Sequence, residues 1–162
     1  MNNLVIYYTY KGNTEIVAKE ISNLIGGDLI KIEELKTPKD SGLFWMAFSA
    51  LIGLKSKIKE IDFNIKKYDN IFIGGQVWAG RTTPAINSLL GKADFGGKNV
   101  YLFLTQADDK EQYKVIQSVT KRVEKHGGKM IDSFFIQTKM ESVITPELAA
   151  GKVSDWIRKL KV

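Results

Sequence analysis

The stretch TYKGNT, Thr9–Thr14, combines residue types that can bind an anion. Thr9 and Thr14 offer hydroxyl groups, Asn13 offers an amide, and Gly12 lets the backbone turn tightly and come close to a ligand. The stretch follows an apolar run and precedes a helical pattern, so the helix would add unpaired N–H groups and the positive end of its dipole. These features suit a terminal phosphate. Taken alone, they fit a capped turn without a ligand equally well.

Two further segments carry polar or aromatic residues where predicted strands end. Gln76–Thr83 reads QVWAGRTT and Thr105–Asp109 reads TQADD. Trp78, with Gly80 close behind it, is an aromatic residue at a strand end and is not typical of a core position. Ligands of an open parallel sheet bind beyond the carboxyl ends of its strands. We therefore expect Thr9–Thr14, Gln76–Thr83 and Thr105–Asp109, called the first, second and third site segments, to meet in one site.

Several other chemistries are excluded because the residues they require are missing. Neither the P-loop motif G-x-x-x-x-G-K-[ST] nor the dinucleotide motif G-x-G-x-x-G occurs. The chain has no cysteine, which excludes disulfides, thiolate nucleophiles and cysteine-held metal or iron–sulfur sites. We identify no catalytic residue and no metal ligands, since His126 lies at a predicted helix end and Asp108-Asp109 is typical of a first helical turn. Arg81 either holds an anionic substrate or the cofactor, or is a plain surface residue.

The elements that must position these segments alternate between strands and helices. Apolar runs predict five strands, at Asn3–Tyr8, Asp28–Glu33, Asn70–Gly75, Asn99–Leu104 and Met130–Gln137. Apolar stripes predict helices that end at Gly26-Gly27 and Gly127-Gly128, a helix over Pro84–Leu90 and a last helix after Thr145-Pro146-Glu147. This alternation predicts an α/β fold, with a parallel sheet covered by helices on both faces.

The connection over residues 34–69 contains an apolar stretch, Leu43–Leu54, which reads LFWMAFSALIGL. It is too short to cross a bilayer, which takes about 20 residues. We expect a buried crossover helix. The alternatives are a helix that docks on a second copy of the chain, giving a homodimer, or a helix that forms part of a site wall.

Length and composition indicate one globular domain over residues 1–162. No secretion signal or transmembrane segment is recognisable, so we expect a cytoplasmic protein. Lys and Arg number 24 against 18 acidic residues, which gives a net charge of +6. Lysine-rich runs without interleaved aromatic residues are typical of solvated surfaces, and we expect no nucleic-acid partner.

The three site segments together resemble those of the flavodoxin family. TYKGNT resembles the phosphate loop of that family, usually [ST]-x-[ST]-G-N-T. GGQVWAGRTTPAI resembles the segment in which a tryptophan lies beside the flavin ring, and LFLTQADD resembles the third flavin loop. The resemblance implies a flavodoxin-like doubly wound five-stranded parallel sheet with strand order 2-1-3-4-5, an apolar insertion between strands 2 and 3, and noncovalently bound FMN.

The resemblance also implies which residues contact the FMN. Thr9, Tyr10, Lys11, Gly12, Asn13 and Thr14 would surround the 5′-phosphate; Val77, Trp78, Ala79 and Gly80 would line the isoalloxazine; Thr105, Gln106, Ala107 and Asp108 would border its pyrimidine side. Lys11 replaces the usual hydroxyl residue, and it either pairs with the phosphate or points to solvent. The third segment lacks the tyrosine that often covers the second flavin face, so that face is open to a substrate or covered by Tyr10, Tyr113 or Leu43–Leu54.

Three functions are compatible with these residues. The first is an FMN-binding redox protein that carries electrons between partner proteins. The second is an NAD(P)H-dependent reductase that passes electrons to a quinone, a free flavin or another small acceptor. The third is a flavin-free regulatory domain that keeps the fold.

Overall fold

The computed structural model describes residues 1–35, 48–60, 65–139, 142–160 and 162. Its elements are β1 (Asn3–Tyr7), α1 (Asn13–Ile25), β2 (Asp28–Lys31), the 3-10 helix η1 (Ile65–Lys67), β3 (Asn70–Trp78), β4 (Arg81–Thr82), α3 (Pro84–Leu90), β5 (Asn99–Gln106), α4 (Tyr113–Lys125), β6 (Lys129–Gln137) and α5 (Pro146–Lys159). Residues 48–51 are also helical. No helix within these described ranges has the length and apolar character needed to cross a membrane.

The five long strands form one parallel sheet in the order β2-β1-β3-β5-β6. This order confirms the predicted fold class, with the fourth and fifth predicted strands now β5 and β6. The short strand β4 was not predicted, and it pairs with the end of β3 in antiparallel fashion.

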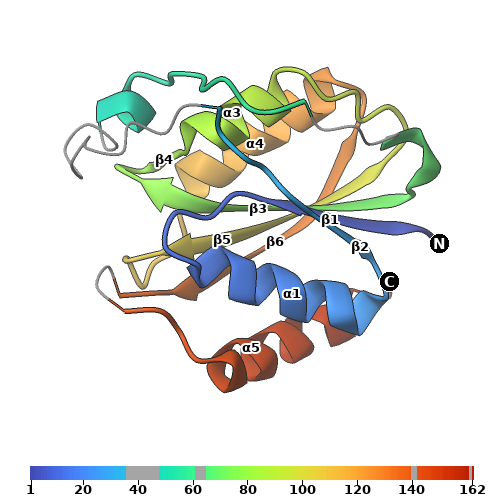
Figure 1. Ribbon diagram of the computed structural model, residues 1–162. Helices are drawn as coiled ribbons and strands as arrows, with labels where there is room; N and C mark the ends of the chain where they lie inside the picture. Colours follow the sequence, from blue (N-terminus) through green and yellow to red (C-terminus); the bar gives the residue numbers. More distant parts are fainter. Residues whose placement is uncertain (36–47, 61–64, 140–141, 161) are drawn as a thin grey trace.

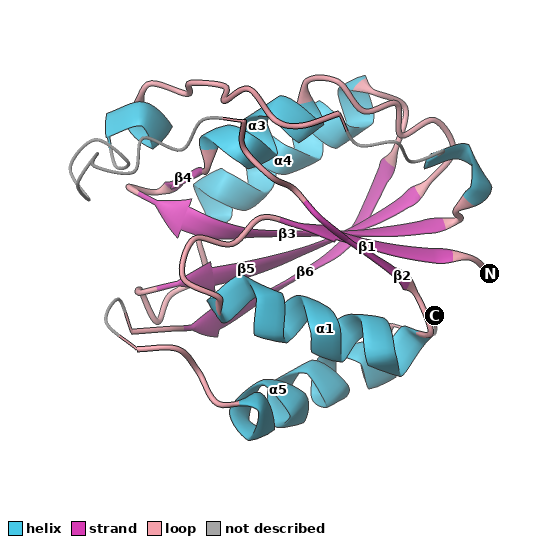
Figure 2. Cartoon of the chain, viewed as in Figure 1, coloured by secondary structure: helices cyan, strands magenta, loops and turns pink. Residues whose placement is uncertain are grey.

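Helices cover both faces of the sheet, with α1 and α5 on one side and α3 and α4 on the other (Figures 1 and 2). Successive residues of β1 point to opposite faces, so Leu4 and Ile6 pack in the core under α3 and α4, while Val5 and Tyr7 pack in the core under α1 and α5. This explains why the central strands are apolar on successive residues.

Two neighbouring glycines of β3 allow this close packing. A Cβ atom on Gly74 would lie 2.0 Å from Cζ of Phe103, whose ring is fully buried. A Cβ atom on Gly75 would lie 2.8 Å from Cγ1 of Ile86 in α3. The two glycines therefore make room for an aromatic ring on one face of the sheet and for a helix on the other.

The segment at residues 48–54 is not the buried helix that was predicted. Phe48, Leu51, Ile52 and Leu54 are exposed, although Ala50 between them is buried. The prediction of a buried helix is therefore wrong for residues 48–54, because this segment lies at the protein surface. Residues 43–47, the rest of the predicted stretch, lie outside the described ranges.

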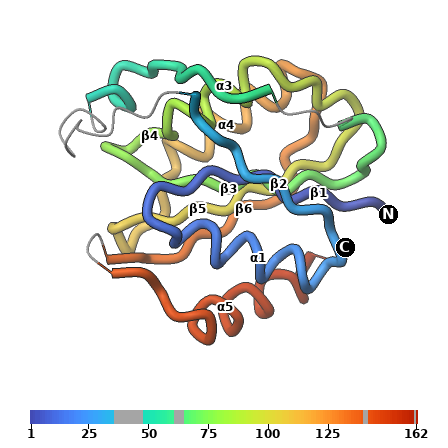
Figure 3. Tube along the Cα trace, in the orientation of Figure 1, coloured from blue at the N-terminus to red at the C-terminus, as the bar shows by residue number. Residues whose placement is uncertain are grey.

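The chain after residue 53 runs across the outer side of α3 (Figure 3). Asn87 Nδ2 donates to the carbonyl of Leu54 over 3.1 Å, and Ser88 Oγ donates to the carbonyl of Ser56 over 2.6 Å. Side chains of α3 thus hold the returning chain by its backbone, and apolar burial of residues 51–54 is not what keeps it in place.

Replacement of Gly74 by alanine should lower the free energy of unfolding by about 1–3 kcal/mol, because the new methyl group overlaps the Phe103 ring. Gly151→Ala is the matched control: Gly151 lies inside α5, and a Cβ added there would meet nothing within 4 Å, so the same substitution should raise stability by about 0.5–1 kcal/mol. Urea denaturation measures both. Equal effects of the two substitutions would contradict the packing account.

Candidate cofactor site

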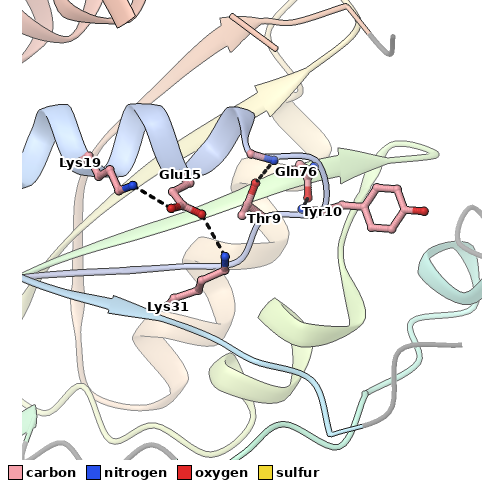
Figure 4. Close-up of polar contacts among 7 residues, drawn as sticks. Thr9, Tyr10, Glu15, Lys19, Lys31 and Gln76 are labelled. Atoms are coloured by element: carbon pink, nitrogen blue, oxygen red, sulfur yellow. Dashed lines mark hydrogen bonds and ion pairs between the residues drawn. The ribbon is translucent and has the colours of Figure 1, made fainter. Parts of the chain in front are cut away.

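The first site segment forms a tight turn between β1 and α1. Gly12 has a φ of 97°, a conformation that side chains other than glycine's rarely adopt, and a Cβ there would meet nothing within 4 Å. The backbone N–H of Gly12 donates to Thr9 Oγ1 over 3.0 Å, which closes the turn (Figure 4). The backbone N–H of Tyr10 donates to Gln76 Oε1 over 2.9 Å, which ties the turn to β3.

Helix α1 begins at Asn13 with Gly12 as its N-cap, and glycine has no side chain that could accept from the first helical turn. The first intrahelical bond that closes on Gly12 runs from the N–H of Ile16 to the Gly12 carbonyl over 3.1 Å. The N–H groups of the first turn have no acceptor inside a helix and carry the positive end of its dipole. The segment therefore offers backbone donors at the position where the sequence predicts an anion.

The Asn13 side chain does not point toward this turn but binds the chain before α5. Its Oδ1 accepts from the N–H of Ile144 over 2.8 Å, and its Nδ2 donates to the Ser142 carbonyl over 3.4 Å. Oδ1 and one of the two Nδ2 hydrogens of Asn13 are thus engaged within the chain, and a contact of this amide with an anion stays a prediction. Asn13 can still contribute its backbone N–H group.

Glu15 adds a negative charge beside the first turn of α1, and two lysines neutralise it. Its carboxylate lies 2.8 Å from Nζ of Lys19 and 2.9 Å from Nζ of Lys31 (Figure 4). The hydrogen bonds from Lys19 and then Lys31 lower the pKa of the Glu15 carboxyl. The pairing offsets repulsion that this acid would otherwise exert on an anion at the helix N-terminus.

The second site segment is a β-hairpin and not a loop as predicted. Strand β3 continues through Val77 and Trp78, which pair with Thr82 and Arg81 of β4. The two turn residues, Ala79 and Gly80, have φ values of 48° and 70°, the positive pair typical of a type I′ turn. The prediction missed the hairpin because alanine rarely adopts this left-handed conformation.

The Trp78 ring is half-buried between two tyrosines. The ring centroids of Tyr8 and Tyr10 lie 6.3 Å and 6.0 Å from it, and both rings meet it edge-on at 82° and 86°. Tyr8 is itself anchored, since its hydroxyl donates to Glu34 Oε2 over 3.0 Å, and burial raises the pKa of this hydroxyl well above its usual value. Trp78 is therefore oriented before any ligand arrives.

The third site segment begins inside β5, which extends to Gln106, and not after it as predicted. Thr105 and Gln106 are buried, while Ala107 and Asp108 are exposed. Gln106 Nε2 donates to the carbonyls of Asp108 and Lys110 over 3.1 Å and 2.6 Å, which holds the turn beyond the strand. Its Oε1 is buried, and no group in the described part of the chain donates to it.

Asp108 stays ionised at the tip of this turn. Its Oδ1 accepts from the backbone N–H of Lys110 over 3.0 Å, and its Oδ2 accepts from Gln112 Nε2 over 3.1 Å. The pKa of the Asp108 carboxyl is lowered, first by the Lys110 N–H. Both oxygens thus support the turn that follows β5.

The structure brings the three segments together at one edge of the sheet. Thr14 Oγ1 and Thr105 Oγ1 share a buried hydrogen bond of 2.8 Å, which joins the first segment to the third. The contacts of Tyr10 with Gln76 and Trp78 join the first segment to the second. The sequence analysis did not identify Gln76 as the residue that holds the first segment against β3. The signal that could have found it is a polar residue directly after the buried run of β3.

These residues fit a cofactor with a phosphate and a flat ring. The left-handed Gly12 keeps the turn open at its Cβ position, the first turn of α1 supplies N–H donors, and a preoriented tryptophan lies across from them on β3. The sequence prediction of an anion site next to an aromatic surface therefore agrees with the geometry, while the assignment of single residues to FMN stays a prediction.

The buried Thr14–Thr105 pair gives a prediction for stability. Thr14→Val should lower the free energy of unfolding by about 1–3 kcal/mol, because it leaves the buried Thr105 hydroxyl without its partner. The double variant Thr14→Val/Thr105→Val removes both hydroxyls and should recover most of this loss. Urea denaturation of the wild type, of the single variants Thr14→Val and Thr105→Val, and of the double variant measures the coupling. Strictly additive losses would show that the pair does not join the segments.

Comparison with known proteins supports the same family as the site segments. The flavodoxin family model matches residues 2–146. A flavodoxin of Synechocystis sp. is 26% identical over 175 residues, which cover 97% of this chain and 94% of the relative.

Two solved structures share the fold. A protein from Bacteroides eggerthii has a TM-score of 0.80 and 20% identity, over 99% of this chain and 98% of that one. A flavoprotein in complex with FMN from Lactobacillus acidophilus has a TM-score of 0.69 and 22% identity, over 83% of this chain and 92% of that one. Because the family model spans most of the chain and the three segments meet where the fold requires, this chain belongs to the flavodoxin family.

Proposed function

We propose that this protein binds FMN at the three site segments and uses it to carry electrons between partner proteins. The observation that carries the proposal is the joining of the Gly12 turn, the Trp78 hairpin and the Thr105 strand end by direct contacts at one edge of the sheet. The neighbour in complex with FMN has the same fold, which supports the choice of cofactor.

The chain's own residues would bind the two ends of FMN differently. Backbone N–H groups of the first segment and of the first turn of α1 would hold the phosphate, with Lys11 able to add a charge at the surface. Trp78, held by Tyr8 and Tyr10, would stack against the ring, and the turn held by Gln106 would border it. When bound, FMN supplies the electron chemistry, and the protein supplies binding, orientation and electrostatics.

Exposure at this edge supports the carrier function. Tyr10 is 46% exposed, and Ala79, Gly80, Ala107 and Asp108 are also exposed. A partner protein could therefore approach the residues assigned to the ring without a conformational change. Since the chain carries a net charge of +6, we expect an acidic docking surface on the partner and weaker association at high salt.

A second candidate is an NAD(P)H-dependent reductase of a small acceptor, and one observation favours it. A cavity of about 530 Å³ adjoins the Ala79–Gly80 turn, and this volume is large enough for a small molecule beside the ring. In this case the flavin would react with small substrates directly, and no protein partner would be required.

Trp78→Ala should weaken FMN binding by about 1–3 kcal/mol, or roughly 5- to 150-fold in Kd, because the ring loses its stacking surface. Quenching of FMN fluorescence on titration into apoprotein measures the affinity. Trp78→Phe is the control: it keeps an aromatic face and should retain part of the lost affinity. An unchanged affinity of Trp78→Ala would remove this residue from the site.

The carrier and the reductase differ in what reduces the flavin. For the carrier, the flavin absorbance should persist for minutes under NADH or NADPH without oxygen and should bleach when a flavin-dependent reductase protein is added. Rapid bleaching by NADH or NADPH alone, followed by turnover with a quinone, would instead establish the reductase. Protein that is colourless as purified and leaves added FMN unquenched would contradict both.

A further inference from the structure

The cavity beside the Ala79–Gly80 turn is distinct from the first site segment, which resembles a phosphate loop. Its walls come from the β3–β4 hairpin, from Asn87 of α3, from α4 and from residues 50–53. Helix α4 packs against both β4 and α3. Residues 79–82 of the second site segment line it, whereas none of Thr9–Thr14 does.

Three cationic side chains line this cavity. Arg81 comes from β4, and Lys114 and Arg122 come from α4, where Ser118 lies between them. Residues 114, 118 and 122 are spaced by four, so they share one face of the helix. The cations are therefore gathered by the packing of α4 on the hairpin, and they do not form a run in the sequence.

None of the three cations has a carboxylate partner among the described residues, where the ion pairs involve other lysines and Arg158. Arg122 is half-buried, and its guanidinium donates to the side chain and the carbonyl of Asn87 over 2.7 Å and 2.8 Å. These bonds use two of the five guanidinium N–H donors and fix the orientation of the group. Burial lowers the pKa of Arg122, although a guanidinium stays charged at neutral pH.

A partly buried cation without a counterion is costly, and an anionic ligand would offset this cost. We propose that this cavity binds a small organic phosphate, with its phosphate oxygens at Arg81, Lys114 and Arg122 and its organic part against Leu51 and Val115. Two guanidiniums and an ammonium match the charge and the several oxygens of a phosphate group. A volume of about 530 Å³ exceeds that of a phosphate alone and leaves room for a body of nucleoside size.

This inference does not depend on the proposed electron carrier, because Arg81, Lys114 and Arg122 are not among the residues assigned to FMN. If FMN binds as proposed, the occupant would lie next to the turn that borders the ring. It would then be positioned either as a small redox substrate or as a ligand whose binding changes the flavin environment through Ala79 and Gly80.

Isothermal titration calorimetry of the FMN-loaded protein with ADP tests the proposal. ADP should bind, adenosine should bind at least tenfold more weakly, and inorganic pyrophosphate should compete with ADP. The double variant Arg81→Gln/Lys114→Gln should weaken ADP binding about 10- to 100-fold, because it removes two of the three cations that line the cavity. Arg122→Gln is a poorer test of ligand binding, because it would also remove the hydrogen bonds that join α4 to Asn87 of α3.

Lys152→Gln/Lys159→Gln is the matched control, because it removes the same charge from α5 on the opposite face of the sheet and should leave ADP affinity unchanged. No heat with ADP, equal binding of adenosine and ADP, tighter binding of citrate than of ADP, or full affinity in the Arg81/Lys114 variant would each overturn the proposal. Flavin absorbance of the same samples reports FMN binding separately, so a failure of the cavity and a failure of the flavin site give different results.

Discussion

Parallel pairing of β1, β3 and β5 is the constraint on which the rest of this structure depends. It places the ends of three strands side by side, so that Tyr8, Gly74 and Thr105 come close although they are far apart in the sequence. The pairing requires a close fit: at Gly74 the ring of Phe103 occupies the space of a side chain. This central part of the sheet therefore has no room for a side chain at Gly74.

The contacts at the strand ends convert this backbone arrangement into a binding site. The Thr14–Thr105 hydroxyl pair fixes the start of α1 against β5, and the Tyr10–Gln76 bond fixes the preceding turn against β3. Trp78 is then held by Tyr8 and Tyr10, which both lie in the connection between β1 and α1. Each of these contacts joins two segments, so the turn, the hairpin and the strand end are expected to support one another's orientation.

The fold was predictable from the sequence because its signals are local. Apolar runs that predict strands, apolar stripes that predict helices, and glycines that end helices can each be recognised within a short stretch of sequence. The Gly12 turn was predictable for the same reason, because Gly-Asn-Thr between a strand and a helix indicates a tight turn.

The side-chain orientation of Asn13 was not predictable, because its partners lie at residues 142–144 and come close only in the folded chain. The β3–β4 hairpin was missed since Ala79 adopts a conformation that its residue type disfavours. The exposed surface at residues 48–54 was missed because apolar composition alone does not show what covers a segment.

The most direct measurement of the central claim is the amide NMR spectrum of 15N-labelled apoprotein as FMN is added. If FMN binds as proposed, the largest shifts should occur at Gly12, Asn13 and Thr14 around the phosphate. Large shifts should also occur at Ala79, Gly80 and the Trp78 indole around the ring, while amides of α5 change little. Shifts confined to other parts of the chain, or an unchanged spectrum at saturating FMN, would contradict it.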